Sequence, residues 1–93
     1  MKIFRKKEYL TALKIILKYI SLNSKNRAKN FKNQLDNKIN KLDNFPHKFK
    51  QSRLHDNTDV REMVFKGYSI IYFVEEEKDR ISVIDIFKWV DKD

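Results

Sequence analysis

The first half of the chain alternates between apolar and polar residues with the period of an α-helix. Over residues 7–22, apolar side chains recur three or four positions apart: Tyr9, Leu10, Leu13, Ile16, Leu17 and Ile20. Over residues 25–44, a single apolar stripe has the same spacing: Ala28, Phe31, Leu35, Ile39 and Leu42. The two stripes predict two amphipathic helices. The break at residues 22–24, where Asn23 or Ser24 can cap the second helix, predicts an antiparallel helical hairpin.

A row of asparagines accompanies the second predicted helix on the side opposite its apolar stripe. Its members are Asn23, Asn26, Asn30, Asn33, Asn37, Asn40 and Asn44. Asparagine is a weak helix former, so burial of the apolar face must stabilise this helix. The pattern is typical of an ordinary solvated face, and a recognition surface is the alternative.

The second half of the chain changes to the pattern of β-strands. Pro46 ends the helical region, because the residue before a proline is pushed out of the α conformation. A basic, irregular connection over residues 46–59 follows, and then three strand-like runs over residues 60–65, 68–74 and 80–87. Lys66 and Gly67 separate the first two runs, and a two-residue loop with glycine predicts a β-hairpin. Residues 1–4 are predicted to add an edge strand.

These elements predict one α+β domain spanning residues 1–93. It has a short N-terminal strand, an antiparallel helical hairpin and then a three-stranded antiparallel sheet with residues 68–74 in the middle. This middle strand is apolar on both faces, since Ile70 and Tyr72 alternate with Ile71 and Phe73. A helical hairpin covers only one face of a sheet. The second face must therefore be partly covered by something else or expose an apolar patch, which favours a protein partner.

Charge is distributed unevenly over the 93 residues, whose net charge is +8. Residues 1–55 carry fifteen Lys and Arg against three Asp and Glu, a net charge of +12, and residues 56–93 carry six against ten, a net charge of −4. This polarity indicates an anionic partner, either nucleic acid or an acidic protein, and a solubilising surface explains it equally well.

Composition excludes several classes of protein. The chain has no cysteine, which excludes disulfides and thiolate metal sites. It also lacks a run of about 18 apolar residues and an apolar signal-peptide segment, so we expect a cytoplasmic protein without a membrane span. His47 and His55 lack the spacing and the further ligands of a metal site, and no cofactor is predicted.

In this order, the elements resemble the RelE/ParE superfamily of toxins over nearly the whole chain. The resemblance rests on five stretches: Lys18-Tyr19-Ile20; Ala28-x-x-Phe31-x-x-x-Leu35-x-x-x-Ile39-x-x-Leu42-x-x-x-Pro46; Val60-Arg61-Glu62-Met63; Lys66-Gly67-Tyr68-Ser69-Ile70-Ile71-Tyr72; and Ile81-x-Val83-x-x-Ile86-Phe87. No single stretch is specific, but together they are distinctive.

The resemblance implies the toxin of a type II toxin–antitoxin module, which inhibits bacterial growth until a cognate antitoxin protein neutralises it. Some members of the superfamily cleave messenger RNA on the ribosome, and others poison DNA gyrase. The nuclease branch usually carries Tyr or His near the end of the last strand, where this chain reads Phe87-Lys88-Trp89-Val90. This departure slightly favours a gyrase inhibitor. A ribosome-dependent endoribonuclease and a degenerate toxin that only binds antitoxin are the alternatives.

If the chain is a nuclease, its candidate catalytic residues are basic. They are Lys48, Lys50 and Arg53 in the connection, Arg61 on the first strand of the hairpin, and Lys88 in place of the usual terminal residue. Clustered cations stabilise the charge of a phosphorane-like transition state, and they lower one another's pKa. A solvated loop explains the three connection residues equally well, whereas for Arg61 a functional role is favoured over an ion pair with Glu62 or a neighbouring acid. Trp89 is expected to pack against the helices or the antitoxin, or to stack on a base.

Overall fold

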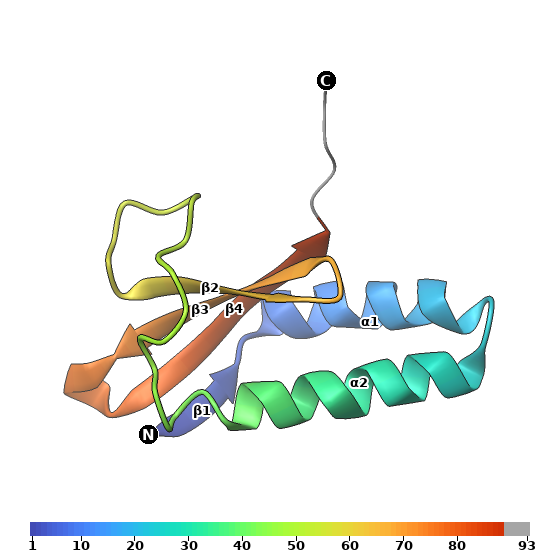
Figure 1. Cartoon of the computed structure of the whole chain (residues 1–93), viewed down its shortest axis with the longest axis horizontal. Helices are drawn as coiled ribbons and strands as arrows, with labels where there is room; N and C mark the ends of the chain where they lie inside the picture. Colours follow the sequence, from blue (N-terminus) through green and yellow to red (C-terminus); the bar gives the residue numbers. More distant parts are fainter. Residues whose placement is uncertain (89–93) are drawn as a thin grey trace.

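The computed structural model describes residues 1–88 and confirms the predicted α+β architecture. Its elements are β1 (Lys2–Arg5), α1 (Lys7–Ser21), α2 (Lys25–Asn40), β2 (Val60–Phe65), β3 (Tyr68–Glu75), a 3₁₀ turn (Glu76–Lys78) and β4 (Arg80–Lys88). The two helices lie side by side, and the connection between α2 and β2 rises beside the sheet before β2 begins (Figure 1). Neither helix in the described part of the chain is long and apolar enough to cross a bilayer.

The strands form one four-stranded sheet in the order β1-β4-β3-β2. β2 and β3 pair antiparallel, as do β3 and β4. β1 pairs in parallel with β4, so the sheet is mixed rather than purely antiparallel. A parallel pair needs a long connection between its strands, and here the helical hairpin, β2 and β3 all lie between β1 and β4 in the sequence. The β2–β3 turn is as predicted, with positive φ at both Lys66 (50°) and Gly67 (85°).

The end of α2 is where the sequence-based boundaries were wrong. The helix ends at Asn40 rather than at residue 44, and the next residues form turns in which the Leu42 N–H donates to the Ile39 carbonyl (3.0 Å). Leu42 is nevertheless 2% exposed. The helical spacing of apolar residues therefore continues beyond the end of the helix, because the tighter turn that follows still directs Leu42 into the core. At the other end, Ser24 caps α2 and accepts a hydrogen bond from the Arg27 N–H (3.1 Å).

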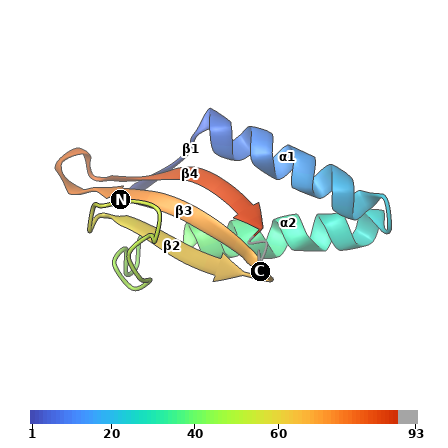
Figure 2. The same cartoon turned by 90° about the horizontal axis from the view of Figure 1, so that it is seen from above.

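The core lies between the helical hairpin and one face of the sheet (Figure 2). It comprises Tyr9, Leu13, Phe31, Leu35, Ile39, Leu42, Met63, Phe65, Ile70, Tyr72, Val74, Ile81, Val83 and Ile86. The asparagines of α2 are all exposed, as expected for the face opposite the apolar stripe. Burial of Phe31, Leu35 and Ile39 thus accounts for a helix that its asparagine content would not stabilise alone.

The second face of the sheet does not expose the apolar patch that the sequence left open. Ile71 is 1% exposed and lies in register between Glu62 of β2 and Asp85 of β4. Val64, near the end of β2, is exposed on this face, and the other large exposed apolar side chains lie on β1, at α1 and in the α2–β2 connection: Phe4, Leu10, Ile15, Tyr19, Leu22, Phe45 and Leu54. The surface available to an apolar partner is therefore the helix and the connection rather than the middle strand.

The β3–β4 turn is closed by a carboxylate whose charge the fold stabilises. Glu75 accepts hydrogen bonds from the Arg80 guanidinium (2.7 Å) and the Ser82 hydroxyl (2.6 Å), and these bonds lower the pKa of Glu75 from 4.5 to about 2. Since the unfolded chain binds the proton more tightly, this stabilisation is complete above about pH 4.5 and is lost as the pH falls towards 2.

We expect Glu75→Gln to flatten the loss of stability between about pH 5 and pH 2, because glutamine has no proton to take up. Urea unfolding at several pH values checks this prediction. Glu77→Gln is the matched control, since Glu77 is exposed and its removal should leave the acid dependence as in the wild type. Equal slopes for the wild type and Glu75→Gln would show that Glu75 does not contribute.

Candidate functional site

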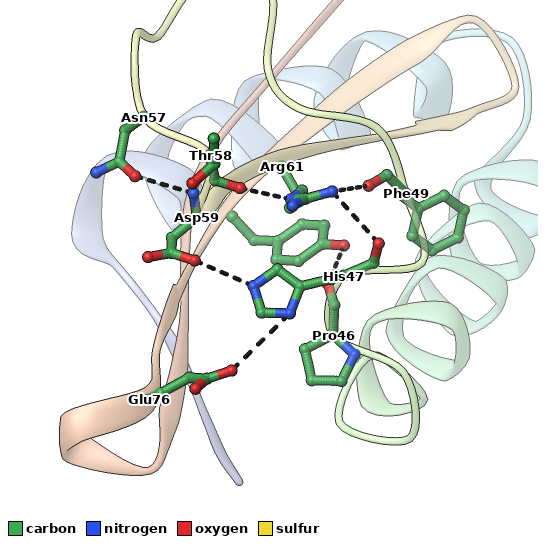
Figure 3. A network of polar contacts seen from close by, with 9 residues as sticks. Pro46, His47, Phe49, Asn57, Thr58, Asp59, Arg61 and Glu76 are labelled. Carbon is green, nitrogen blue, oxygen red and sulfur yellow. Dashed lines mark hydrogen bonds and ion pairs between the residues drawn. The ribbon is translucent and has the colours of Figure 1, made fainter.

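Arg61, the residue most favoured by the sequence, lies at the centre of a polar network beneath the α2–β2 connection (Figure 3). Its Nε donates to the Thr58 carbonyl (2.7 Å), and its Nη1 donates to the carbonyls of Phe49 (3.0 Å) and His47 (3.3 Å). Three backbone oxygens from both ends of the connection thus converge on one guanidinium. The guanidinium is planar and carries several N–H donors, so it can bind three carbonyl oxygens at once. These bonds position the connection over the sheet.

Two more side chains tie the same segment to the sheet. The Tyr72 hydroxyl donates to the Pro46 carbonyl (2.8 Å), and burial raises the pKa of Tyr72 to about 12. The ring of His47 lies between two carboxylates, with Nε2 3.1 Å from Asp59 and Nδ1 4.0 Å from Glu76 (Figure 3). Across residues 1–88, however, no group of three or more His, Asp and Glu side chains is placed to hold a metal ion.

Arg53 and Glu62 form a second cluster on the opposite face of the sheet. The carboxylate of Glu62 is buried and accepts hydrogen bonds from Arg53 Nη2 (2.7 Å) and from the Ser69 hydroxyl (2.8 Å). The bond with Glu62 raises the pKa of Arg53 above its ordinary value. A buried carboxylate needs such partners, so the described contacts of Arg53 include a structural ion pair.

The three candidate lysines are exposed: Lys48 and Lys50 flank Phe49 in the connection, whereas Lys88 lies at the end of β4. Lys48 has its ammonium 5.5 Å from the centre of the Phe49 ring, and the Lys50 carbonyl accepts a hydrogen bond from the Glu62 N–H (2.9 Å). Lys88 lies at the end of β4, with its ammonium 6.0 Å from the centre of the Tyr68 ring. Trp89 lies outside the described residues.

The candidates are therefore divided, because Lys48, Lys50 and Arg61 share the connection whereas Arg53 and Lys88 are separated from Arg61. Strand alternation places Arg61 on the helix side of β2, whereas Arg53 binds Glu62 on the other side. Lys88 pairs in register with Tyr68, four residues along β3 from Tyr72, the partner of Arg61. Four residues of a strand correspond to about 13 Å. Catalysis by these residues stays a prediction.

Some members of these networks were not predicted. An ion pair of Arg61 with Glu62 was the less favoured alternative from the sequence; neighbouring residues on a strand point to opposite faces, and Glu62 binds Arg53. The alternation of side chains along the strand was the sequence signal that could have indicated this. Nothing in the sequence pattern identified the bond from Tyr72 to Pro46, because it joins a buried strand to an irregular segment 26 residues away.

The family model described as the ParE toxin of the type II toxin–antitoxin system parDE matches residues 3–88, and the chain belongs to this family. No curated protein matches the chain in sequence.

Two solved structures share the fold. A chain of the chromosomal ParDE toxin–antitoxin system from P. aeruginosa superposes with a TM-score of 0.76 at 15% identity, over 97% of each chain. The isolated E. coli RelE toxin superposes with a TM-score of 0.67 at 20% identity, over 99% of this chain and 87% of the other. At these identities the likeness establishes the fold, and both branches of the superfamily have it.

Proposed function

We propose that this toxin inhibits growth by acting on DNA gyrase, and that a cognate antitoxin protein neutralises it. We choose gyrase over RNA as the target because the basic residues that a nuclease would use are dispersed in the structure. Arg61 is bonded to three backbone carbonyls, Arg53 is paired with the buried Glu62, and Lys88 lies at the far end of the sheet.

Metal-free cleavage of RNA requires several groups around one phosphate. A base must take the proton of the 2′-hydroxyl, cations must stabilise the developing charge, and an acid must protonate the leaving oxygen. Of the candidate cations, Arg53 is paired with Glu62 and Lys88 lies at the end of β4, which leaves Lys48, Lys50 and Arg61 at the connection. Inhibition of gyrase by binding requires only a complementary surface, which fits a chain whose conspicuous features are exposed basic and apolar side chains.

An antitoxin partner is supported by the apolar surface of α1. Ile15, Tyr19 and Leu22 recur at helical spacing and are 66%, 67% and 78% exposed. Ile15 and Tyr19 also border a groove of about 460 Å³ between α1 and the ends of β3 and β4. An apolar stripe of this kind on a domain of 93 residues is typical of a surface that another protein covers.

Two assays run side by side test the target. We expect the purified toxin to suppress supercoiling by gyrase or to trap cleaved DNA, and the antitoxin to reverse the effect. Primer extension on translated message should show no new ends at any toxin concentration. Ribosome-dependent cuts would replace this proposal with the nuclease alternative. If the folded protein has no effect in either assay, we would conclude that it is a degenerate toxin that only binds antitoxin.

A further inference from the structure

The solvent-exposed side of α2 is a row of asparagines with basic side chains on both sides of it. Each residue advances by about 100° around a helix, which places four asparagines opposite the buried stripe: Asn26, Asn30, Asn33 and Asn37. The same rotation places cations on both flanks of this row, with Lys25, Lys29 and Lys32 on one side and Arg27, Lys38 and Lys41 on the other. All ten residues are exposed, and together they are called the α2 outer face below.

Most side chains of the α2 outer face have no role in holding the fold together. Asn40, at the end of the helix, accepts a hydrogen bond from Arg5 (3.1 Å), whereas the four asparagines of the outer face make no side-chain hydrogen bond within residues 1–88. Asp36 is the only acid of α2, and its carboxylate is bound by Lys32 (2.7 Å) and lies 3.8 Å from Arg5. The helix forms the lower border of the molecule in Figure 1, so a large ligand can reach it.

We infer that the α2 outer face binds duplex DNA, with the asparagines in the major groove and the flanking cations on the phosphates of the two strands. The inference concerns DNA rather than gyrase, so it goes beyond the proposed function and does not depend on it. A helix with its side chains is about 10–12 Å wide, and the major groove of B-DNA is about 12 Å wide. An asparagine amide binds N6 and N7 of adenine, whereas lysine and arginine bind phosphates of any sequence.

Duplex DNA fits this face better than another protein or RNA does. The core of a protein interface is apolar and poor in charge, whereas none of the large exposed apolar side chains of residues 1–88 lies on α2. Residues 25–41 carry six Lys and Arg against one Asp, a net charge of +5, which suits a polyphosphate. The major groove of an RNA duplex is too deep and narrow for side chains to read.

The test follows the fluorescence anisotropy of labelled duplexes of about 20 base pairs, or two helical turns, as full-length toxin is added. Of two duplexes of equal length, we expect the wild type to bind the one rich in A·T about 5-fold or more tightly than the one rich in G·C. Asn30→Ala combined with Asn33→Ala should remove this preference, because asparagine pairs with adenine. Alanine favours the helix, so circular dichroism should show that the variant is folded.

The flanking cations should affect both duplexes alike. Arg27→Gln combined with Lys29→Gln removes one cation from each flank, and we expect about 10-fold weaker binding and a salt dependence that is shallower by about 2 in log–log slope. The matched control, Lys2→Gln combined with Lys78→Gln, removes the same charge and should change binding less than about 2-fold. Lys2 lies on the face of β1 opposite Ile3, which packs against the core, and Lys78 lies in the β3–β4 turn.

Four results would overturn the inference. Absence of binding to either duplex at about 50 mM salt would leave the α2 outer face as a solvated surface. An equal loss in the control variant would mean that the whole basic surface attracts DNA. An unchanged preference in the asparagine variant, or equally tight binding of an RNA duplex, would exclude the major groove. Since the binding assay contains no gyrase, each of these results leaves the proposed function as it stands.

Discussion

Leu35→Ala is expected to lower the free energy of unfolding by about 2–5 kcal/mol, the range for removing a buried leucine side chain. Leu35 is 0% exposed and lies in the apolar stripe of α2, packed within the core between the helical hairpin and the sheet. The cavity left by the substitution has little room to collapse, because helix and sheet residues both border it. Urea unfolding followed by circular dichroism measures the change.

Asn33→Ala provides the control on the same helix. Asn33 is exposed on the opposite face, so we expect a change within about 0.5 kcal/mol of zero. Alanine also has the higher helix propensity, which makes a small gain in stability the expected direction. Equal unfolding midpoints for the two variants would mean that the buried face of α2 has been assigned wrongly.

Local sequence patterns predicted most of this fold because each pattern has a local physical cause. Gly67 and the alternation on both sides of it predicted the β2–β3 hairpin, and the spacing of Phe31, Leu35 and Ile39 predicted the buried face of α2. The end of α2 was missed because Leu42 continues the apolar period through a turn. The parallel pairing of β1 with β4 was also missed, since no local signal specifies which distant strand an edge strand joins.

The candidate site was less predictable for a related reason. The sequence identified Arg61 as unusual, but its partners are carbonyl oxygens, which every residue carries and no pattern reveals. Likewise, nothing in a count of charges indicates that Glu62 is buried and that Arg53 binds it. Charge counting also did not distinguish exposed cations such as Lys48 from cations such as Arg53 that are used in folding.

The second large effect is expected from Arg61→Ala, which we expect to lower the free energy of unfolding by about 2–4 kcal/mol. The substitution removes charged donors from the carbonyls of His47, Phe49 and Thr58, and a hydrogen bond to a charged group contributes about 1.5–3 kcal/mol. The effect of three such bonds is not additive, because the loosened connection regains some bonds to water. Amide exchange over residues 47–50 should rise in parallel.

Arg61→Lys separates this positioning role from a catalytic one. Lysine keeps the charge but replaces the planar fork by a single ammonium, so we expect it to recover less than half of the lost stability. Gyrase inhibition per folded molecule should stay within about 2-fold of the wild type in both variants. A charge-stabilising catalytic residue would behave in the opposite way, since its loss reduces turnover by about 10²-fold or more while stability is unchanged. That result, together with ribosome-dependent cleavage by the wild type, would contradict the positioning role and the gyrase proposal together.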